Sequence, residues 1–129
     1  MIGVEWMTRI PPPGEAILPV VWIDVAKVDL AWAISEYYVS KGGGCAGIPE
    51  RYEQFGIWFE LKVPIQIACI DLLDEAIEFI DGRHRFAWLR DHGVKIMPVH
   101  VPLDKVGIIK CCFEVVNPFL KKESCSIKP

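Results

Sequence analysis

The apolar residues in the first half of the chain follow two spacings, and each spacing predicts a kind of element. β-branched and aromatic residues succeed one another over residues 20–25 and predict a strand. Apolar residues recur at helical spacing after Asp29, a candidate helix cap, and predict a helix over residues 29–41. The same spacing recurs behind Pro49, which suits the first turn of a helix, and predicts a second helix over residues 50–59.

The second half of the chain begins with a strand, an ambiguous stretch and a helix bounded by glycines. Residues 63–70 are β-branched and apolar, and they predict a strand. Residues 72–81 fit either a helix or a turn followed by a strand, and periodicity does not decide between them. Gly82 stands where a strand gives way to a helix and Gly93 where that helix ends, so a helix is expected over residues 83–92.

Two further strands are expected toward the C-terminus. Residues 95–101 predict one strand, in which Pro98 indicates an edge strand or a strand end because proline donates no backbone hydrogen bond. The β-rich run over residues 107–116 predicts the last strand. Cys111 and Cys112 are then expected on opposite faces of that strand, as small reduced side chains.

Composition limits the classes of protein to which the chain can belong. It has 129 residues, of which 52% are hydrophobic, and a net charge of -3. No apolar run approaches the roughly 18 residues that a membrane span needs, and the N-terminus has no uninterrupted apolar stretch typical of a secretory signal. Five cysteines without a C-x-x-C pair predict reduced thiols and no metal site. We therefore expect a cytoplasmic protein with no membrane partner.

The chain is expected to form one domain over residues 1–129, because no linker or internal repeat divides it. Residues 1–17 predict an N-terminal arm, since three consecutive prolines favour an extended path. The arm carries Trp6 and Met7, and the chain is unusually apolar for a lone core of this size. Together these features predict a homodimer.

Basic residues gather where the helix after Gly82 should begin. A helix N-terminus carries about half a positive charge and disfavours cations, so a negative partner is expected there. Free backbone amides, the helix dipole and a flexible glycine are the elements of a phosphate site. On this interpretation the phosphate ligands are Gly82, Arg83, His84 and Arg85, with Arg85 as the principal anion clamp. The alternative is that Asp81 caps the helix and pairs with one arginine while His84 lies at the surface.

Residues 64–101 combine a glycine, a basic pair, an alanine and a second glycine around this helix. These residues are Gly82, His84, Arg85, Ala87 and Gly93. Their arrangement resembles the core of the ParB/sulfiredoxin superfamily. The resemblance implies an α+β fold in which helices pack on a mixed sheet. It also favours a turn near residues 73–75 and a strand over residues 76–80 in the ambiguous stretch.

In that family the motif binds nucleotide phosphates, and it serves CTP binding in ParB proteins, ATP-dependent sulfinic acid repair in sulfiredoxins and phosphoryl transfer in free serine kinases. The resemblance implies a nucleotide or another phosphate-bearing small molecule at the turn, with or without Mg²⁺. Arg83 stands where sulfiredoxins have a cysteine, so sulfiredoxin activity is not expected. If the chain is an enzyme, which the residues leave open, phosphoryl transfer or NTP hydrolysis is expected, with the candidate catalytic residues Asp24, Asp29 and His84. Residues 42–62 match no part of the family and are interpreted as an insertion.

Two other functions compete with phosphate binding. One is a DNA-binding or nuclease-like ParB relative, which the isoelectric point near 5.6 opposes because DNA binding needs several basic contacts to phosphates. The other is a non-catalytic protein-interaction module, for which the five tryptophans and the apolar surplus are the support.

Overall fold

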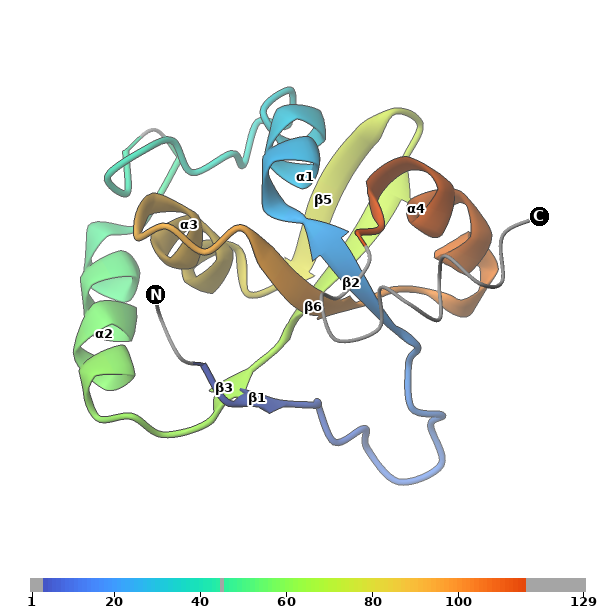
Figure 1. Cartoon of the computed structure of the whole chain (residues 1–129), viewed down its shortest axis with the longest axis horizontal. Helices are drawn as coiled ribbons and strands as arrows, with labels where there is room; N and C mark the ends of the chain where they lie inside the picture. The colour runs from blue at the N-terminus through green and yellow to red at the C-terminus, as the bar shows by residue number, and fades with distance from the viewer. Residues whose placement is uncertain (1–3, 45, 116–129) are drawn as a thin grey trace.

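A computed structural model describes residues 4–44 and 46–115 (Figure 1). Its elements in chain order are β1 (Trp6–Met7), β2 (Val20–Asp24), α1 (Val25–Trp32), α2 (Pro49–Glu60), β3 (Ile65–Gln66), β4 (Ala68–Leu73), β5 (Ala76–Asp81), α3 (Arg83–Asp91), β6 (Ile96–His100), a 3-10 turn (Leu103–Lys105) and α4 (Val106–Phe113).

The main sheet has four strands in the order β2-β6-β4-β5. The β2/β6 and β4/β5 pairs are antiparallel, while β4 and β6 run parallel at the centre. A separate parallel pair joins β1 to β3. The sequence prediction of an α+β fold with a mixed, mostly antiparallel sheet is confirmed, and the architecture is consistent with a ParB/sulfiredoxin-like fold.

The ambiguous stretch before Gly82 forms a hairpin, as the resemblance favoured. β4 and β5 pair down to Leu73 and Ala76, and Asp74 adopts a left-handed φ of 58° in the turn between them. β5 then ends at Asp81, and Gly82 alone separates it from the start of α3 at Arg83. The hairpin therefore places the turn at Gly82 at the end of the sheet.

An aromatic cluster joins the helices to the sheet. The ring of Trp32 on α1 lies 4.6 Å from Phe79 on β5 and 5.6 Å from Phe86 on α3, measured between centroids. On the other side of α3, Trp88 contacts α2 through Phe55 and Phe59, at 5.5 and 4.9 Å. α2 is thus attached to the core through α3.

The predicted helix over residues 29–41 is wrong in its position. α1 begins at Val25, directly after β2, and ends at Trp32. Its cap is Asp24, whose carboxylate accepts a hydrogen bond from the backbone amide of Lys27 at 3.2 Å. The helix begins after Asp24 rather than Asp29 because a helix that starts there buries Val25, Val28 and Trp32 on one face.

The predicted last strand is also wrong, because most of it is helix α4. Ile109 and Phe113 are buried while Cys111 between them is exposed, a pattern that fits a helix and not a strand, in which all three would share one face. Cys111 and Cys112 are both exposed on this helix rather than divided between two strand faces. The β-branched composition suggested a strand, but the helical spacing of the buried positions decides the outcome.

Two smaller differences concern the strands. The segment predicted as one strand over residues 63–70 is divided between β3 and β4. Pro98 lies within β6, an interior strand, so its interpretation as an edge residue is wrong. Pairing with β4 begins at Val99, one residue later, and the missing amide of Pro98 falls outside that ladder.

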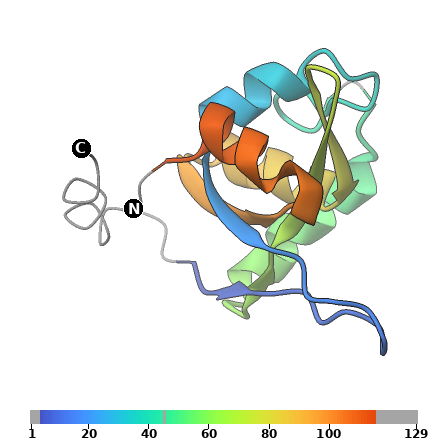
Figure 2. The same cartoon turned by 90° about the vertical axis from the view of Figure 1, so that its right-hand side faces the viewer.

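The N-terminal segment is attached to the body at two places, and residues 10–17 form a loop that extends away from the sheet (Figures 1 and 2). The first attachment is the β1/β3 pair. The second is His100, 1% exposed, whose Nε2 accepts a hydrogen bond from the Arg9 amide at 2.9 Å and whose Nδ1 lies 3.1 Å from the carbonyl oxygen of Leu18. Within the described residues, the helices are all too short or too polar to cross a membrane.

Candidate functional site

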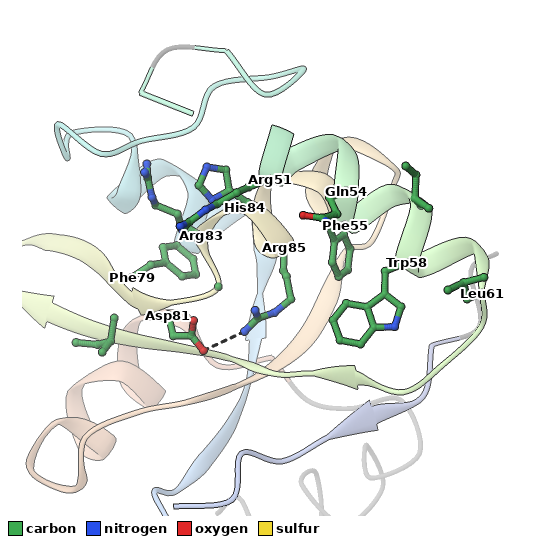
Figure 3. Close-up of a pocket in the computed structure, with 13 residues that line it drawn as sticks. Arg51, Gln54, Phe55, Trp58, Leu61, Phe79, Asp81, Arg83, His84 and Arg85 are labelled. Atoms are coloured by element: carbon green, nitrogen blue, oxygen red, sulfur yellow. Dashed lines mark hydrogen bonds and ion pairs between the residues drawn. The ribbon is translucent and has the colours of Figure 1, made fainter. Parts of the chain in front are cut away.

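A cavity of about 680 Å³ lies between α2 and the turn from β5 to α3 (Figure 3). One side, here called the α2 wall, consists of Arg51, Gln54, Phe55, Ile57, Trp58 and Leu61. The opposite side, the turn wall, consists of Phe79, Ile80, Asp81, Gly82, Arg83, His84 and Arg85. The structure thus brings together the four residues that the sequence proposed as phosphate ligands.

Gly82 is the residue on which the turn wall depends. It precedes α3 with a left-handed φ of 91°, which L side chains rarely adopt. A Cβ atom at this position would lie 2.8 Å from the Cβ of Ala68 on β4 and 2.7 Å from Nη2 of Arg85. Both the conformation and the space therefore require glycine.

The first turn of α3 has no side-chain cap. The alternative in which Asp81 caps this helix is therefore wrong, although Asp81 does pair with an arginine. Nη2 of Arg85 lies 3.2 Å from Oδ2 of Asp81, and both side chains are partly exposed, at 22% and 44%. Backbone amides at an uncapped helix start remain available to an acceptor from outside.

Arg85, expected as the principal anion clamp, is already engaged. Its Nε donates to the carbonyl oxygen of Gln66 at 3.0 Å, in addition to the ion pair with Asp81. Figure 3 shows its side chain crossing the floor of the cavity toward Asp81. The guanidinium keeps its charge at the cavity, but two of its donor groups already have protein acceptors.

Arg83 forms hydrogen bonds with the loop between α1 and α2. Its Nη1 donates to the carbonyl oxygens of Tyr37 and Ala46, at 3.1 and 2.7 Å. The guanidinium also lies 5.8 Å from the centroid of the Tyr37 ring. This side chain therefore holds the loop as well as adding positive charge to the turn wall.

His84 is buried rather than at the surface, with 7% of it exposed. Its Nε2 accepts a hydrogen bond from the backbone amide of Ile48 at 2.9 Å, directly before α2 begins. Burial lowers the pKa of the imidazole, and the positive charges of Arg83 and Arg51 lower it further. The ring is thus held neutral with its proton on Nδ1, and Nε2 cannot donate to a phosphate.

The other two candidate catalytic residues lie outside the cavity lining. Asp24 caps α1. Asp29 accepts hydrogen bonds from Nη1 of Arg90 at 3.0 Å and from the hydroxyl of Tyr38 at 3.2 Å. Both carboxylates therefore have structural partners, and the structure does not bring them to Gly82.

Sequence reasoning missed the α2 wall, which lies in the segment interpreted as an insertion. Arg51 is exposed and has no hydrogen-bond or ion-pair partner among the described residues. Trp58 is 47% exposed although it is a tryptophan. Helical spacing in the sequence does not say which element a face meets, although it does place one set of residues on a single face: Arg51, Gln54, Phe55, Trp58 and Leu61.

Residues suited to a metal do not gather in the described part of the chain. No group of three His, Cys, Asp or Glu side chains there is arranged to hold an ion. The carboxylate among the described lining residues is Asp81, which is paired with Arg85. Any Mg²⁺ at this site would need phosphate oxygens as additional ligands.

Comparisons with known proteins show the fold and no more. No family model matches the sequence, and no curated protein matches it. A solved structure that does match is the gold(I) cyanide derivative of Oncogenic Suppression Activity Protein, described as a plasmid fertility inhibition factor. The TM-score is 0.57 at 17% identity, over 93% of this chain and 77% of that chain. The likeness loosely supports the ParB/sulfiredoxin-like fold, so the ligand must be argued from the residues of the cavity.

Proposed function

We propose that the chain binds a nucleotide or another phosphate-bearing small molecule in the cavity beside Gly82. The observation that carries this proposal is the balance of charge in the lining. Three arginines, Arg51, Arg83 and Arg85, face one carboxylate, that of Asp81. Burial is the main cause of the lowered pKa of His84, and the charges of Arg83 and Arg51 lower it further, as positive charge gathered beside the ring would.

Two further features support an anionic ligand. The first turn of α3 has backbone amides without a side-chain cap, next to a glycine that lets a ligand approach closely. The Asp81–Arg85 ion pair is partly exposed, and pairs of this kind contribute about 0–1 kcal/mol. A phosphate with two negative charges can therefore displace the Asp81 carboxylate from Arg85 at little cost.

The residues support binding more directly than catalysis. Among the described lining residues, His84 is the imidazole and Asp81 the carboxylate, and both already have protein partners. Phosphoryl transfer or NTP hydrolysis would require one of these groups to exchange its partner when the ligand arrives. We therefore propose a binding site and leave turnover to experiment.

Thermal unfolding with a panel of nucleoside mono-, di- and triphosphates and pyrophosphate tests this proposal. A ligand that binds only the folded state raises the midpoint of unfolding, and the rise grows with the logarithm of the ligand concentration relative to Kd. Arg51→Ala should weaken binding about tenfold or more, the loss expected for a hydrogen bond to a charged group. Lys27→Ala makes the same change in net charge at an exposed site outside the cavity lining and should leave binding unchanged. If no compound of the panel shifts the unfolding of the parent chain, the proposal is wrong.

We further propose a cytoplasmic homodimer as the working form. Support comes from apolar side chains left exposed on α1, in the turn directly after it and on α4, and these two helices contact each other. Leu30 is 75% exposed, Ile34 69% and Ile108 51%. Light scattering at about 10 µM should give twice the chain mass, since stable dimers persist at such concentrations. A monomeric mass would oppose the dimer and leave the cavity proposal intact.

A further inference from the structure

We propose that the α2 wall selects the ligand, and that it does so by recognising a flat heterocyclic body attached to the phosphate. The inference rests on the proposed function, because the phosphate itself is assigned to Arg51 and the turn wall. It assigns specificity to Trp58 and Gln54, which belong to the segment without a counterpart in the ParB/sulfiredoxin motif.

The α2 wall changes in character along its length. Arg51 lies at the end near His84 and Arg83, and Trp58 and Leu61 lie at the other end (Figure 3). Trp58 follows Arg51 by seven positions, which corresponds to about 10 Å along a helix. That span exceeds the size of an inorganic phosphate and suits a ligand that is charged at one end and apolar at the other.

Trp58 offers a broad apolar surface at the far end of the cavity. It remains 47% exposed, and its neighbours Ile57 and Leu61 on the same wall are each 66% exposed. Exposed aromatic and aliphatic side chains around one concave site are typical of a surface that a ligand covers. A heterocyclic ring stacked on an aromatic side chain contributes enough to raise affinity about tenfold.

The α2 wall is fixed in place before a ligand arrives. Behind Trp58, Phe55 is buried against Trp88 of α3, with 6% exposed. Gly56 allows this close approach, because a Cβ atom there would lie 2.6 Å from Nε1 of Trp88. A wall held in this way loses little conformational entropy when it binds, which favours selection by shape.

Gln54 adds a polar group to the same face. It is exposed, lines the cavity and lies one helical turn from both Arg51 and Trp58. Its amide carries both donors and an acceptor, which match the edge of a heterocycle and have no counterpart in a purely hydrocarbon body. The ligand class that fits the whole wall is therefore a nucleoside phosphate rather than a sugar phosphate or a lipid phosphate.

The experiment compares four probes on the full chain by calorimetric titration: a nucleoside diphosphate, the matching nucleoside, ribose 5-phosphate and pyrophosphate. The parent should bind the nucleoside diphosphate about tenfold or more tighter than ribose 5-phosphate or pyrophosphate, from stacking alone. Trp58→Ala should abolish this preference and leave the affinity for pyrophosphate unchanged. Trp58→Phe should keep most of it, and Glu53→Ala, an exposed site on α2 outside the lining, should keep all of it.

The outcomes separate this inference from the proposed function. If pyrophosphate binds the parent as tightly as the nucleoside diphosphate does, the cavity takes phosphate but α2 does not select, and the inference is wrong. Equal losses for both probes in Trp58→Ala overturn it as well. A nucleoside that binds as tightly as its diphosphate overturns the phosphate site itself, and so does the absence of any binding.

Discussion

The two walls of the cavity differ in what their polar groups already do. The turn wall holds most of the basic residues, yet Arg83 donates to two loop carbonyls and Arg85 to a carbonyl and a carboxylate. The α2 wall holds a single arginine, Arg51, which has no partner among the described residues. Both arginines of the turn wall thus have part of their donors committed to the protein, whereas Arg51 has none committed among the described residues.

This difference separates two contributions of an arginine to anion binding, its long-range charge and its hydrogen bonds, which a basic motif in a sequence does not distinguish. A guanidinium that donates to neutral carbonyls keeps its positive charge, so it still attracts an anion at long range. Some of its N–H donors, however, are already bonded to the protein. We infer that the turn wall supplies the field, the shape and the free amides of α3, while Arg51 supplies the side chain whose donors are all available to the ligand.

The largest expected effect tests the backbone of the turn wall. Gly82→Ala should destabilise the protein by about 2–4 kcal/mol, because it combines a left-handed backbone with close packing. The added Cβ would lie within 3 Å of Ala68 on β4, which belongs to the sheet and cannot move freely. Urea unfolding measures the change.

The chain offers a matched control for this substitution at the other end of α3. Gly93 has nearly the same φ, 93°, but a Cβ atom there would meet nothing within 4 Å. Gly93→Ala should therefore lose only the conformational part, about 1–2 kcal/mol. Equal losses at the two glycines would mean that the turn does not pack tightly on β4.

A smaller effect should distinguish the two walls by their arginines. Arg83→Ala should lower the free energy of unfolding by about 1 kcal/mol, because the carbonyl oxygens of Tyr37 and Ala46 lose their donor. Arg51→Ala should leave it within about 0.5 kcal/mol, as expected for an exposed side chain without a partner. Urea unfolding without ligand checks both. A larger loss for Arg51→Ala than for Arg83→Ala would reverse the comparison.

The smallest expected effect is a pH dependence of stability. It arises from His84 on the turn wall, whose pKa the charge of Arg51 on the α2 wall helps to lower. Because its pKa in the folded protein lies below the ordinary 6.5, the unfolded chain takes up a proton more readily. The free energy of unfolding should thus fall as pH drops through about 6.5 and level off below the lowered pKa. Unfolding at several pH values between about 7.5 and 5, above the range of the carboxylates, measures this slope.

His84→Gln is the control for the slope, because its amide oxygen can still accept from the Ile48 amide without titrating. It should flatten the parent's pH dependence in this window. Arg51→Ala should reduce the slope slightly, since the charge of Arg51 contributes to the lowered pKa. An unchanged slope in His84→Gln would show that another group causes it.

The turn at Gly82 was predictable only in part from local signals. Gly82 and the helix pattern behind it mark the start of α3 in the sequence itself, whereas the strand before it came from the resemblance, because periodicity left residues 72–81 open. The start of α1 was harder, because Asp24 and Asp29 are both acceptable caps and only burial of Val25 and Val28 decides between them. Local signals therefore fix an element more reliably than its first residue.

The α2 wall could not be predicted as part of the site, because its position depends on packing between distant segments. Gly56 on α2 meets Trp88 on α3 across more than thirty residues of sequence. The helix itself was predicted correctly over residues 50–59, but nothing in its own pattern says which element it faces. The commitment of Arg83 to the carbonyl of Ala46 is nonlocal in the same way, so the sequence overstated its availability.

The contacts of α3 also determine when the loop before α2 can become ordered during synthesis. Arg83 holds the carbonyls of Tyr37 and Ala46, His84 receives the Ile48 amide, and Asp91 receives the amide of Gly42 at 2.9 Å. A ribosome makes these partners some forty residues after the loop itself, at about 5–20 residues per second. During the seconds between, the loop lacks the side chains with which it forms these hydrogen bonds. The loop is thus synthesised before α3, but it can form these hydrogen bonds only after α3 has been synthesised.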